Sequence, residues 1–156
     1  LSNILMTSLL LISLKTISML FFRPKPNSIF GVHDPLGIRY LFQLRVSLSP
    51  LRSHKRRHNF TDTPSDICQC NLGIENTSHF LLSCPSYVTQ RATLITSVNV
   101  ILYKHNLHDL RNQLQLYLYG HRSINYSDNR KIILSTIRYR NASNKRRGRL
   151  LKFSTF

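Results

Sequence analysis

The chain has 156 residues and carries 22 lysines and arginines against six acidic residues, which gives a formal net charge of +16. This length leaves room for one domain with a modest core, and the charge fits a polyanionic partner, either nucleic acid or an anionic membrane face. Three cysteines exclude a complete set of paired disulfides and fit a reducing compartment, so we expect a nuclear or cytoplasmic protein, with a membrane location as the alternative.

The first predicted element is an apolar helix over residues 1–22. Its apolar run, from 4 to 22, is about long enough to cross a bilayer. However, Lys15 near the centre costs roughly 2.5–3.5 kcal/mol on insertion scales, and no positive residue precedes the run as a signal peptide requires. The segment therefore predicts either a membrane anchor or a helix that packs on the rest of a larger protein, in which case the chain, which begins at Leu1, is a fragment.

The composition then divides the remaining chain into a linker, a main domain and a tail. Pro24 and Pro26 favour extended backbone, so we predict a linker at residues 23–29. The main domain is predicted over residues 30–137. Residues 138–156 are rich in lysine and arginine and contain no acid, which predicts a disordered basic tail that serves as a nuclear address or polyanion-binding arm, or comes from out-of-frame translation.

The patterns within the main domain predict a mainly α fold. Asp34-Pro35 is typical of a helix N-terminus, and Ser49-Pro50 is expected to end that helix. Gly37 weakens it. Helical spacing places one apolar set on its inner face: Leu36, Tyr40, Leu44 and Leu48.

Three more helices are predicted after the cysteines. The first covers residues 87–104, where many Val, Ile and Thr residues keep a strand as the alternative. The second covers 107–119 and ends at Gly120, and the third begins at a Ser127-Asp128 cap. The expected inner faces are Val88, Ala92, Ile95, Val98 or Asn99, and Leu102; then Leu107, Leu110, Leu114 and Leu118; then Ile132, Ile133, Thr136 and Ile137.

All three cysteines and one histidine form a CCHC motif, which is the most informative pattern in the chain. Cys68, Cys70, His79 and Cys84 follow the spacing C-x-C, eight residues, H, four residues, C. Three thiolates and an imidazole make a full tetrahedral donor set for one structural zinc, and soft thiolates select zinc over magnesium or calcium. The H-x4-C half matches knuckle modules that bind single-stranded nucleic acid, whereas C-x-C is tighter than the usual C-x2-C. The alternative is three small buried cysteines and an unrelated histidine.

The spacing also makes a prediction about local geometry. Cys84 lies five residues after His79, which is about 140° around an α-helix. Both can therefore reach one ion only if the helix ends near Ser83, where Pro85 favours its end. Turn and cap residues stand between the two halves of the motif: Asn71 and Gly73 for a turn, and Asn76 or Thr77 for a helix N-cap.

A basic segment at residues 52–58 directly precedes the motif, with no acid until Asp62. Cations beside a candidate knuckle favour contact with phosphates, and nearby aromatic rings can stack on unpaired bases. The alternative is a solvated basic turn. The predicted nucleic-acid-binding residues are Arg52, Lys55, Arg56 and Arg57, with Tyr40 or Phe60 available for stacking.

A series of stretches in one order carries a family resemblance: residues 30–35, 40–46, 48–60, 62–68, 73–75, 79–85, Tyr87 and 117–121. This series resembles the C-terminal region of reverse transcriptases from non-LTR retrotransposons, in particular the LINE/jockey-like copies abundant in cnidarian genomes. It covers about two thirds of the chain. In that family the segment follows the polymerase and is interpreted as a zinc-binding tail that contacts nucleic acid. The resemblance is lost over the first 22 residues and after about Tyr139, which suggests a truncated or frame-shifted copy.

We therefore expect a non-catalytic, zinc-dependent fragment that binds RNA or single-stranded DNA and has no small-molecule substrate. The chain lacks the paired aspartates that hold two magnesium ions in a polymerase; the resembled enzymes carry theirs upstream. Two alternatives stay open. One is a small single-pass membrane protein whose basic tail contacts anionic lipid, and the other is a decayed transposon remnant without function.

Overall fold

The computed structural model describes residues 33–153, and their side chains as far as Asn144. The predicted apolar helix at 1–22 and linker at 23–29 lie outside the described residues. Within them the regular structure is helical, apart from one isolated antiparallel bridge between Ile67 and Ile74. The predicted mainly α fold is confirmed. None of the helices in this part of the chain is long and apolar enough to cross a membrane.

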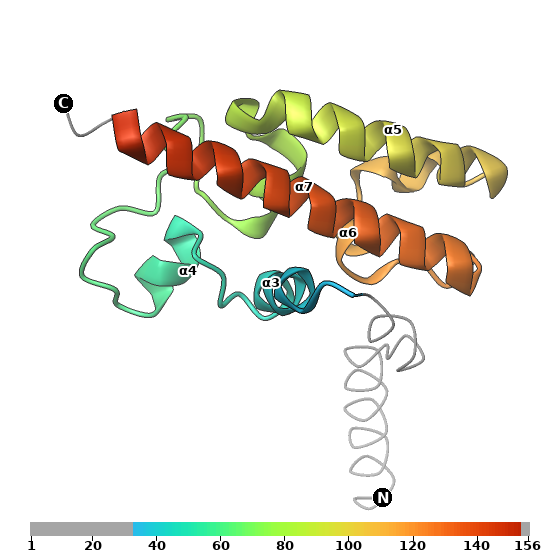
Figure 1. Cartoon of the computed structure of the whole chain (residues 1–156), viewed down its shortest axis with the longest axis horizontal. Helices are drawn as coiled ribbons and strands as arrows, with labels where there is room; N and C mark the ends of the chain where they lie inside the picture. Colours follow the sequence, from blue (N-terminus) through green and yellow to red (C-terminus); the bar gives the residue numbers. More distant parts are fainter. Residues whose placement is uncertain (1–32, 154–156) are drawn as a thin grey trace, which may run out of the picture.

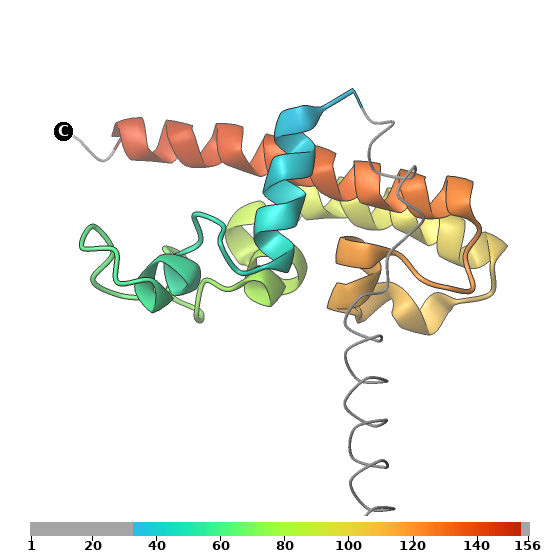
Figure 2. The same cartoon turned by 90° about the horizontal axis from the view of Figure 1, so that it is seen from below.

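The longest helix, α7, runs through the described domain, and helices α3, α5 and α6 pack along it. Figure 1 shows α5 beside α7, and the two views together show α3 crossing α7 on another side (Figure 2). In chain order the elements are α3 (Pro35–Arg45), α4 (Arg52–Arg57), the π-helical turn η1 (His79–Ser83), the 3₁₀ turn η2 (Pro85–Tyr87), α5 (Val88–Lys104), the 3₁₀ turn η3 (His108–Asn112), α6 (Leu114–Tyr119) and α7 (Tyr126–Phe153).

Helix α3 begins as predicted but buries a different face. The Asp34 carboxylate accepts a hydrogen bond from the Gly37 N–H at 2.7 Å and so caps the helix. The buried positions are Gly37, Leu41 and Leu44, whereas Leu36 is 60% exposed. The reason is the crossing with α7, which brings Ile137 against Gly37 so closely that no side chain fits between them. The helix also ends at Arg45, earlier than predicted.

Helix α5 has the predicted extent, and the strand alternative is wrong. Its inner face is rotated from the expected one, because Val88 is 59% exposed and Ala92 is exposed. The face that packs into the core consists of Arg91, Leu94, Val98, Ile101 and Leu102, so the predictions for Val98 and Leu102 are confirmed. An arginine on the inner face interrupts the apolar pattern, which is why the periodicity misplaced the first half of that face.

The segment predicted as one helix over residues 107–119 is divided in two. The turn η3 ends at Asn112, and Gln113 is extended before α6 begins. Gly120 ends α6 with a φ of 78°, as its C-cap position predicted. Of the four expected inner leucines, Leu118 is buried, and the other three pack at the edge of the core.

The N-terminus of α7 carries the most heavily paired acid in the described chain. The cap is Asn125, whose side-chain oxygen accepts from the Asp128 N–H at 2.9 Å, and not the predicted Ser127-Asp128 pair. The buried Asp128 carboxylate instead binds Lys104 at 2.7 Å, His105 at 3.0 Å and Lys131 at 3.0 Å. These donors, Lys104 above all, hold the pKa of Asp128 well below its usual range. They connect the end of α5 to the start of α7.

The prediction of a disordered tail from Arg138 is wrong for residues 138–144, and the boundary predicted after residue 137 falls inside α7. The predicted inner residues Ile132, Ile133, Thr136 and Ile137 are all buried, and the buried face continues with Tyr139, Arg140 and Ser143. The Tyr139 hydroxyl donates to the Phe80 carbonyl at 2.5 Å. The Arg140 guanidinium lies over the ring of Tyr40. These tertiary contacts hold the helix despite its basic composition.

The crossing of α3 and α7 gives the first prediction. Gly→Ala at an exposed helical position raises stability by up to about 1 kcal/mol, but Gly37→Ala should instead lower it by about 1–3 kcal/mol, because the new methyl group would overlap Ile137 and the capping Asp34 carboxylate. Denaturant unfolding measures the change. Thr96→Ala, at an exposed position of α5, is the control and should leave stability unchanged or higher. A Gly37→Ala protein as stable as the parent would contradict the close crossing.

Candidate metal centre

The four predicted ligand residues converge on one point. Their ligand atoms all lie within 4.8 Å of one another, although they come from a loop and from the π-helical turn η1. The Cys68 and Cys84 sulfurs are 3.7 Å apart, and the Cys70 sulfur lies 3.2 Å from His79 Nε2. A tetrahedral zinc requires about 3.8 Å between two sulfur ligands and about 3.6 Å between sulfur and nitrogen. The group can hold a metal ion, and its donors and spacings are compatible with zinc.

The first half of the motif is a tight turn. The Cys68 N–H donates to the Gly73 carbonyl at 2.8 Å, and the Asn71 N–H donates to the Cys68 carbonyl at 2.9 Å. Asn71 adopts a left-handed φ of 59°, a conformation that asparagine tolerates better than most residues. The predicted turn is confirmed. It points Cys68 into the core and leaves Cys70 half-buried at the rim.

The second half ends where the spacing predicted. The Asn76 side chain caps the turn by accepting from the His79 N–H at 2.8 Å. Regular structure stops at Ser83, and Cys84 is extended with φ −60° and ψ 120°. The turn is π-helical, however, with the Cys84 N–H donating to the His79 carbonyl at 2.7 Å. This wider i→i+5 turn brings residues five apart closer to the same side than an α-helix does, and so aligns His79 with Cys84.

The surroundings of the four residues suit metal binding. Ser83 Oγ lies 3.3 Å from His79 Nδ1, so it orients the imidazole with Nε2 toward the cysteines. Burial lowers the pKa of His79, although the charge of Glu75 opposes this, and so favours the neutral form that ligates metals. Burial raises the pKa of the Cys68 thiol to about 12. A metal must therefore displace thiol protons when it binds.

The basic segment forms a helix, α4, instead of a solvated turn, and it is hydrogen-bonded to the loop of the motif. The Arg52 N–H donates to Glu75 Oε2 at 2.9 Å, and its guanidinium donates to the Ile67 carbonyl at 3.1 Å. Lys55 pairs with Asp62 at 2.5 Å. These contacts set the position of α4 relative to the cysteines.

The remaining predicted nucleic-acid-binding residues differ in how far their side chains are exposed and in which groups they contact. The Arg56 guanidinium donates to the Pro64 carbonyl at 2.8 Å, and both Arg56 and Arg57 are exposed. Phe60 is 55% exposed and lies 5.9 Å from Lys55 Nζ. Tyr40 belongs to α3, and Arg140 covers one face of its ring. Of the two predicted stacking residues, Phe60 therefore has the more open ring.

Two buried residues near the centre were missed by sequence reasoning. His54 on α4 bonds Ser49 Oγ through Nδ1 at 2.7 Å and lies 3.4 Å from Thr77 Oγ1 through Nε2. Arg91 on α5 donates to the Cys84 carbonyl at 2.7 Å. Helical spacing could have identified Arg91, because it lies three residues before Leu94 and seven before Val98, which both belong to the buried face of α5. For His54 we find no such signal.

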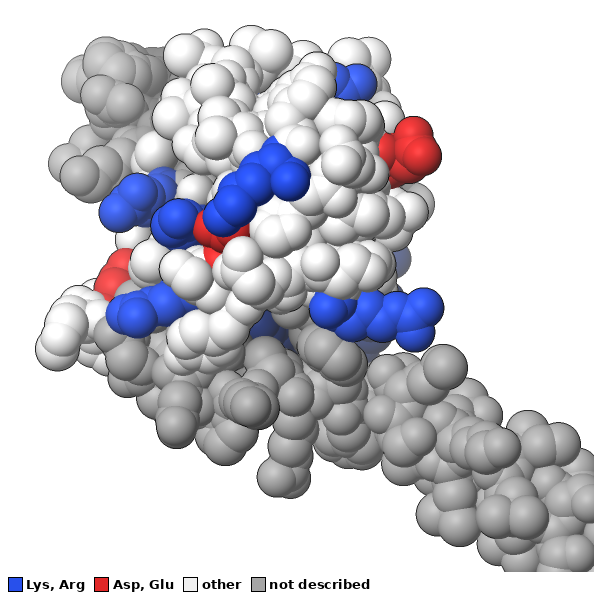
Figure 3. Space-filling model, turned by 90° about the vertical axis from the view of Figure 1, so that its right-hand side faces the viewer, with Lys and Arg blue, Asp and Glu red and all other residues white. Residues whose placement is uncertain are grey.

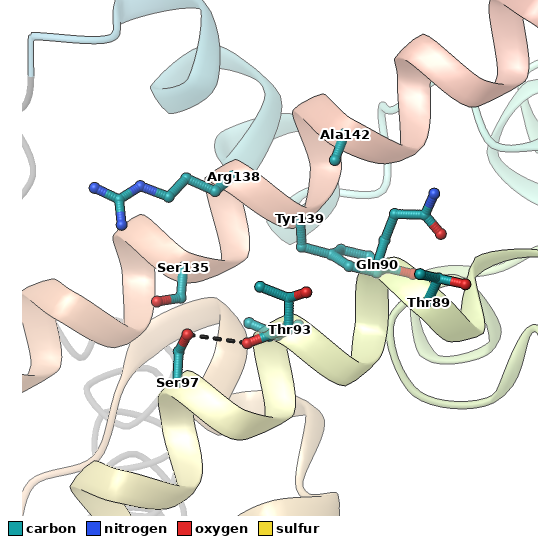
Figure 4. A pocket seen from close by; sticks show the side chains of 9 residues that line it. Thr89, Gln90, Thr93, Ser97, Ser135, Arg138, Tyr139 and Ala142 are labelled. Carbon is teal, nitrogen blue, oxygen red and sulfur yellow. Dashed lines mark hydrogen bonds between the residues drawn. The ribbon is translucent and has the colours of Figure 1, made fainter.

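A pocket of about 320 Å³ lies between α5 and α7, away from the four metal-binding candidates. Figure 4 shows Thr93 and Ser97 of α5 on one side of it and Ser135 of α7 on the other, while the Arg138 side chain extends away from α5. The Ser97 hydroxyl is already used, since it donates to the Thr93 carbonyl at 2.9 Å. The lining contains no carboxylate, histidine or cysteine, so this pocket offers no side chain that commonly binds a metal.

Comparison of the chain with models of protein families, with curated proteins and with solved structures finds no match. The chemistry of the described residues therefore carries the functional argument.

Burial of His54 gives a prediction about pH. Burial, and then Arg57 and His58, lower the pKa of His54, so below about pH 6.5 the unfolded chain binds a proton that the folded chain resists. The stability contributed by neutral His54 should thus be lost as the pH falls. The His54→Asn variant should show a shallower fall in unfolding free energy between about pH 7.5 and about pH 5.5. His108→Asn, at an exposed site on η3, should keep the parental slope; equal slopes for both variants would contradict this role.

Proposed function

We propose that this domain binds one structural zinc ion through Cys68, Cys70, His79 and Cys84, and uses the adjoining α4 to bind single-stranded or structured nucleic acid without catalysing a reaction. The convergence of four soft and imidazole donors within 4.8 Å carries the proposal. Four protein ligands fill a tetrahedral shell, which leaves no position for a catalytic water. The zinc would supply a cross-link between the turn at Cys68 and the η1 turn.

The link from metal to nucleic acid runs through Glu75. Its buried carboxylate accepts from the Arg52 N–H, and its carbonyl accepts from Ser53 Oγ at 2.9 Å. Glu75 belongs to the same loop as Cys68, since the Glu75 N–H donates to the Asp66 carbonyl at 2.8 Å. A metal that orders this loop would therefore also order the N-terminus of α4. Nucleic-acid binding by α4 should then depend on zinc.

The surface near the cluster combines cations with exposed apolar groups. Arg56 and Arg57 are exposed on α4, and Leu72, between the motif halves, is 74% exposed. Phosphates attract the cations, while unpaired bases can stack on Phe60 or pack on Leu72. At the opposite end of the molecule, Lys104 and Lys131 are already paired with Asp128, and Figure 3 shows basic side chains, some of them around an acidic group, on a mostly uncharged face. This contrast favours the α4 end as the binding surface.

The resemblance to the tail of retrotransposon reverse transcriptases supports the same function. In that family the segment contacts nucleic acid next to a polymerase. We therefore propose that the chain derives from such a tail, acts on RNA or single-stranded DNA in the nucleus or cytoplasm, and has no enzymatic activity of its own.

Metal removal tests the zinc site. Purified chain should contain one zinc per molecule, and chelation should lower the melting temperature or abolish the cooperative transition, because metal binding in such modules supplies on the order of 10 kcal/mol toward folding. Elemental analysis and thermal melts with and without chelator measure this. Cys84→Ser is the control, since it should lack zinc and melt alike in both conditions. A metal-free parent whose melt ignores chelator would show that helix packing alone carries the fold.

Salt dependence tests the nucleic-acid surface. Contacts from Arg52, Lys55, Arg56 and Arg57 would give a slope of log affinity against log salt of roughly −2.8 for a single strand, at about −0.7 per phosphate. Changing Arg56 and Arg57 together to alanine should weaken binding to all sequences alike and halve that slope. The matched control removes the same charge from two other exposed sites, Arg111 and Arg122, and should have a smaller effect. A double variant on α4 with parental affinity and slope would move the contact to the basic residues of α7.

A further inference from the structure

Arg91 is a buried cation beside the metal centre and has no anionic partner in the described part of the chain. Its side chain comes from the first turn of α5 and is 7% exposed. Nη2 donates to the Cys84 carbonyl at 2.7 Å. Nη1 is buried and has no hydrogen-bond partner among the described residues. A buried guanidinium in this state is strongly destabilising unless some negative charge compensates it.

The proposed metal centre supplies that negative charge. Three thiolates contribute −3, a neutral imidazole contributes nothing and a divalent ion contributes +2, so the complex carries −1. One guanidinium balances this charge. The two groups are neighbours, because Arg91 already holds the carbonyl of the ligand residue Cys84. The single positive charge of Arg91 is thus equal and opposite to the charge of the metal complex and lies beside it.

We propose that Arg91 is the counter-charge of the metal centre: its buried guanidinium, held beside Cys84, neutralises the monoanionic complex of a divalent ion with three thiolates. This inference rests on the proposed zinc site. Arg91 is then a positioning residue with two tasks, because Nη2 also fixes the backbone where η1 ends. It makes the site specific for an ion whose complex with three thiolates carries a single negative charge.

A purely structural role for Arg91 makes different predictions. If Arg91 only held the Cys84 carbonyl, a neutral side chain with an N–H donor would replace it. If its charge matters, the neutral variant should weaken metal binding while leaving the metal-free protein at least as stable as the parent, since neutral thiols give the buried charge no partner. Only the charge model therefore predicts that a neutral residue at position 91 weakens metal binding without destabilising the metal-free protein.

Competition with a chromophoric chelator on the full chain measures zinc affinity, and cobalt substitution reports the thiolate shell by its charge-transfer absorption. Arg91→Gln should lose about 10- to 100-fold in zinc affinity, the usual effect of removing an outer partner of a metal site. Arg91→Lys, which keeps the charge, should recover most of it. Tyr139→Phe is the matched control, because it removes another buried donor to the same turn, at the Phe80 carbonyl, without changing charge. It should lower stability with and without metal and leave the affinity unchanged.

The outcomes separate this inference from the proposed function. A parent that binds neither zinc nor cobalt removes the metal site itself. A parent that binds zinc, with Arg91→Gln binding equally well, keeps the site and overturns the counter-charge role. An Arg91→Gln protein that is less stable than the parent when both are free of metal also overturns it, because the charge model requires the metal-free variant to be no less stable than the parent.

Discussion

The hydrogen bond from the Cys84 N–H to the His79 carbonyl is the interaction on which the site depends. It closes a turn one residue wider than an α-helical turn, and this brings His79 toward Cys84, which an α-helix would point elsewhere. Neighbouring helices hold that turn from two directions: Tyr139 of α7 donates to the Phe80 carbonyl, and Arg91 of α5 donates to the Cys84 carbonyl. The candidate metal centre is thus built into the helical core and is not an appended loop.

Scarce negative charge is the second constraint on this protein. With a net charge of +16, the folded chain must place its few acids where they hold elements together. Asp34 caps α3 and accepts from Asn141 of α7 at 3.2 Å, Glu75 fastens α4 to the cysteine loop, and Asp128 connects α5 to α7. None of these acids pairs with Arg91, which stands beside the cysteines. Under the proposed function, thiolates bound to a metal would supply negative charge beside it, and metal binding would then stabilise the junction of α5 with η1.

The same arrangement relates the metal to the basic surface. Through Glu75, α4 is hydrogen-bonded to the loop between the metal-binding residues, and through His54 it is bonded to Ser49 and Thr77 on either side. The bonds from Arg52 to Glu75 and from His54 to Thr77 each join residues 23 positions apart in sequence, whereas Ser49 is a local partner of His54. Under the proposed function, a metal that orders this loop would therefore also support α4.

The sequence by itself determined those features of the structure that depend on residues only a few positions apart. The caps at Asp34, Asn76 and Gly120, the turn at Asn71, the end of η1 at Ser83 and the four converging residues all follow from local backbone chemistry and spacing. Tertiary structure decided the rest. The phases of α3 and α5, the buried Arg91 and the ordered helix beyond Arg138 depend on contacts such as Gly37 with Ile137 and Tyr139 with Phe80. Those partners lie tens of residues apart, so no local periodicity records them, and a basic composition even concealed the buried face of α7.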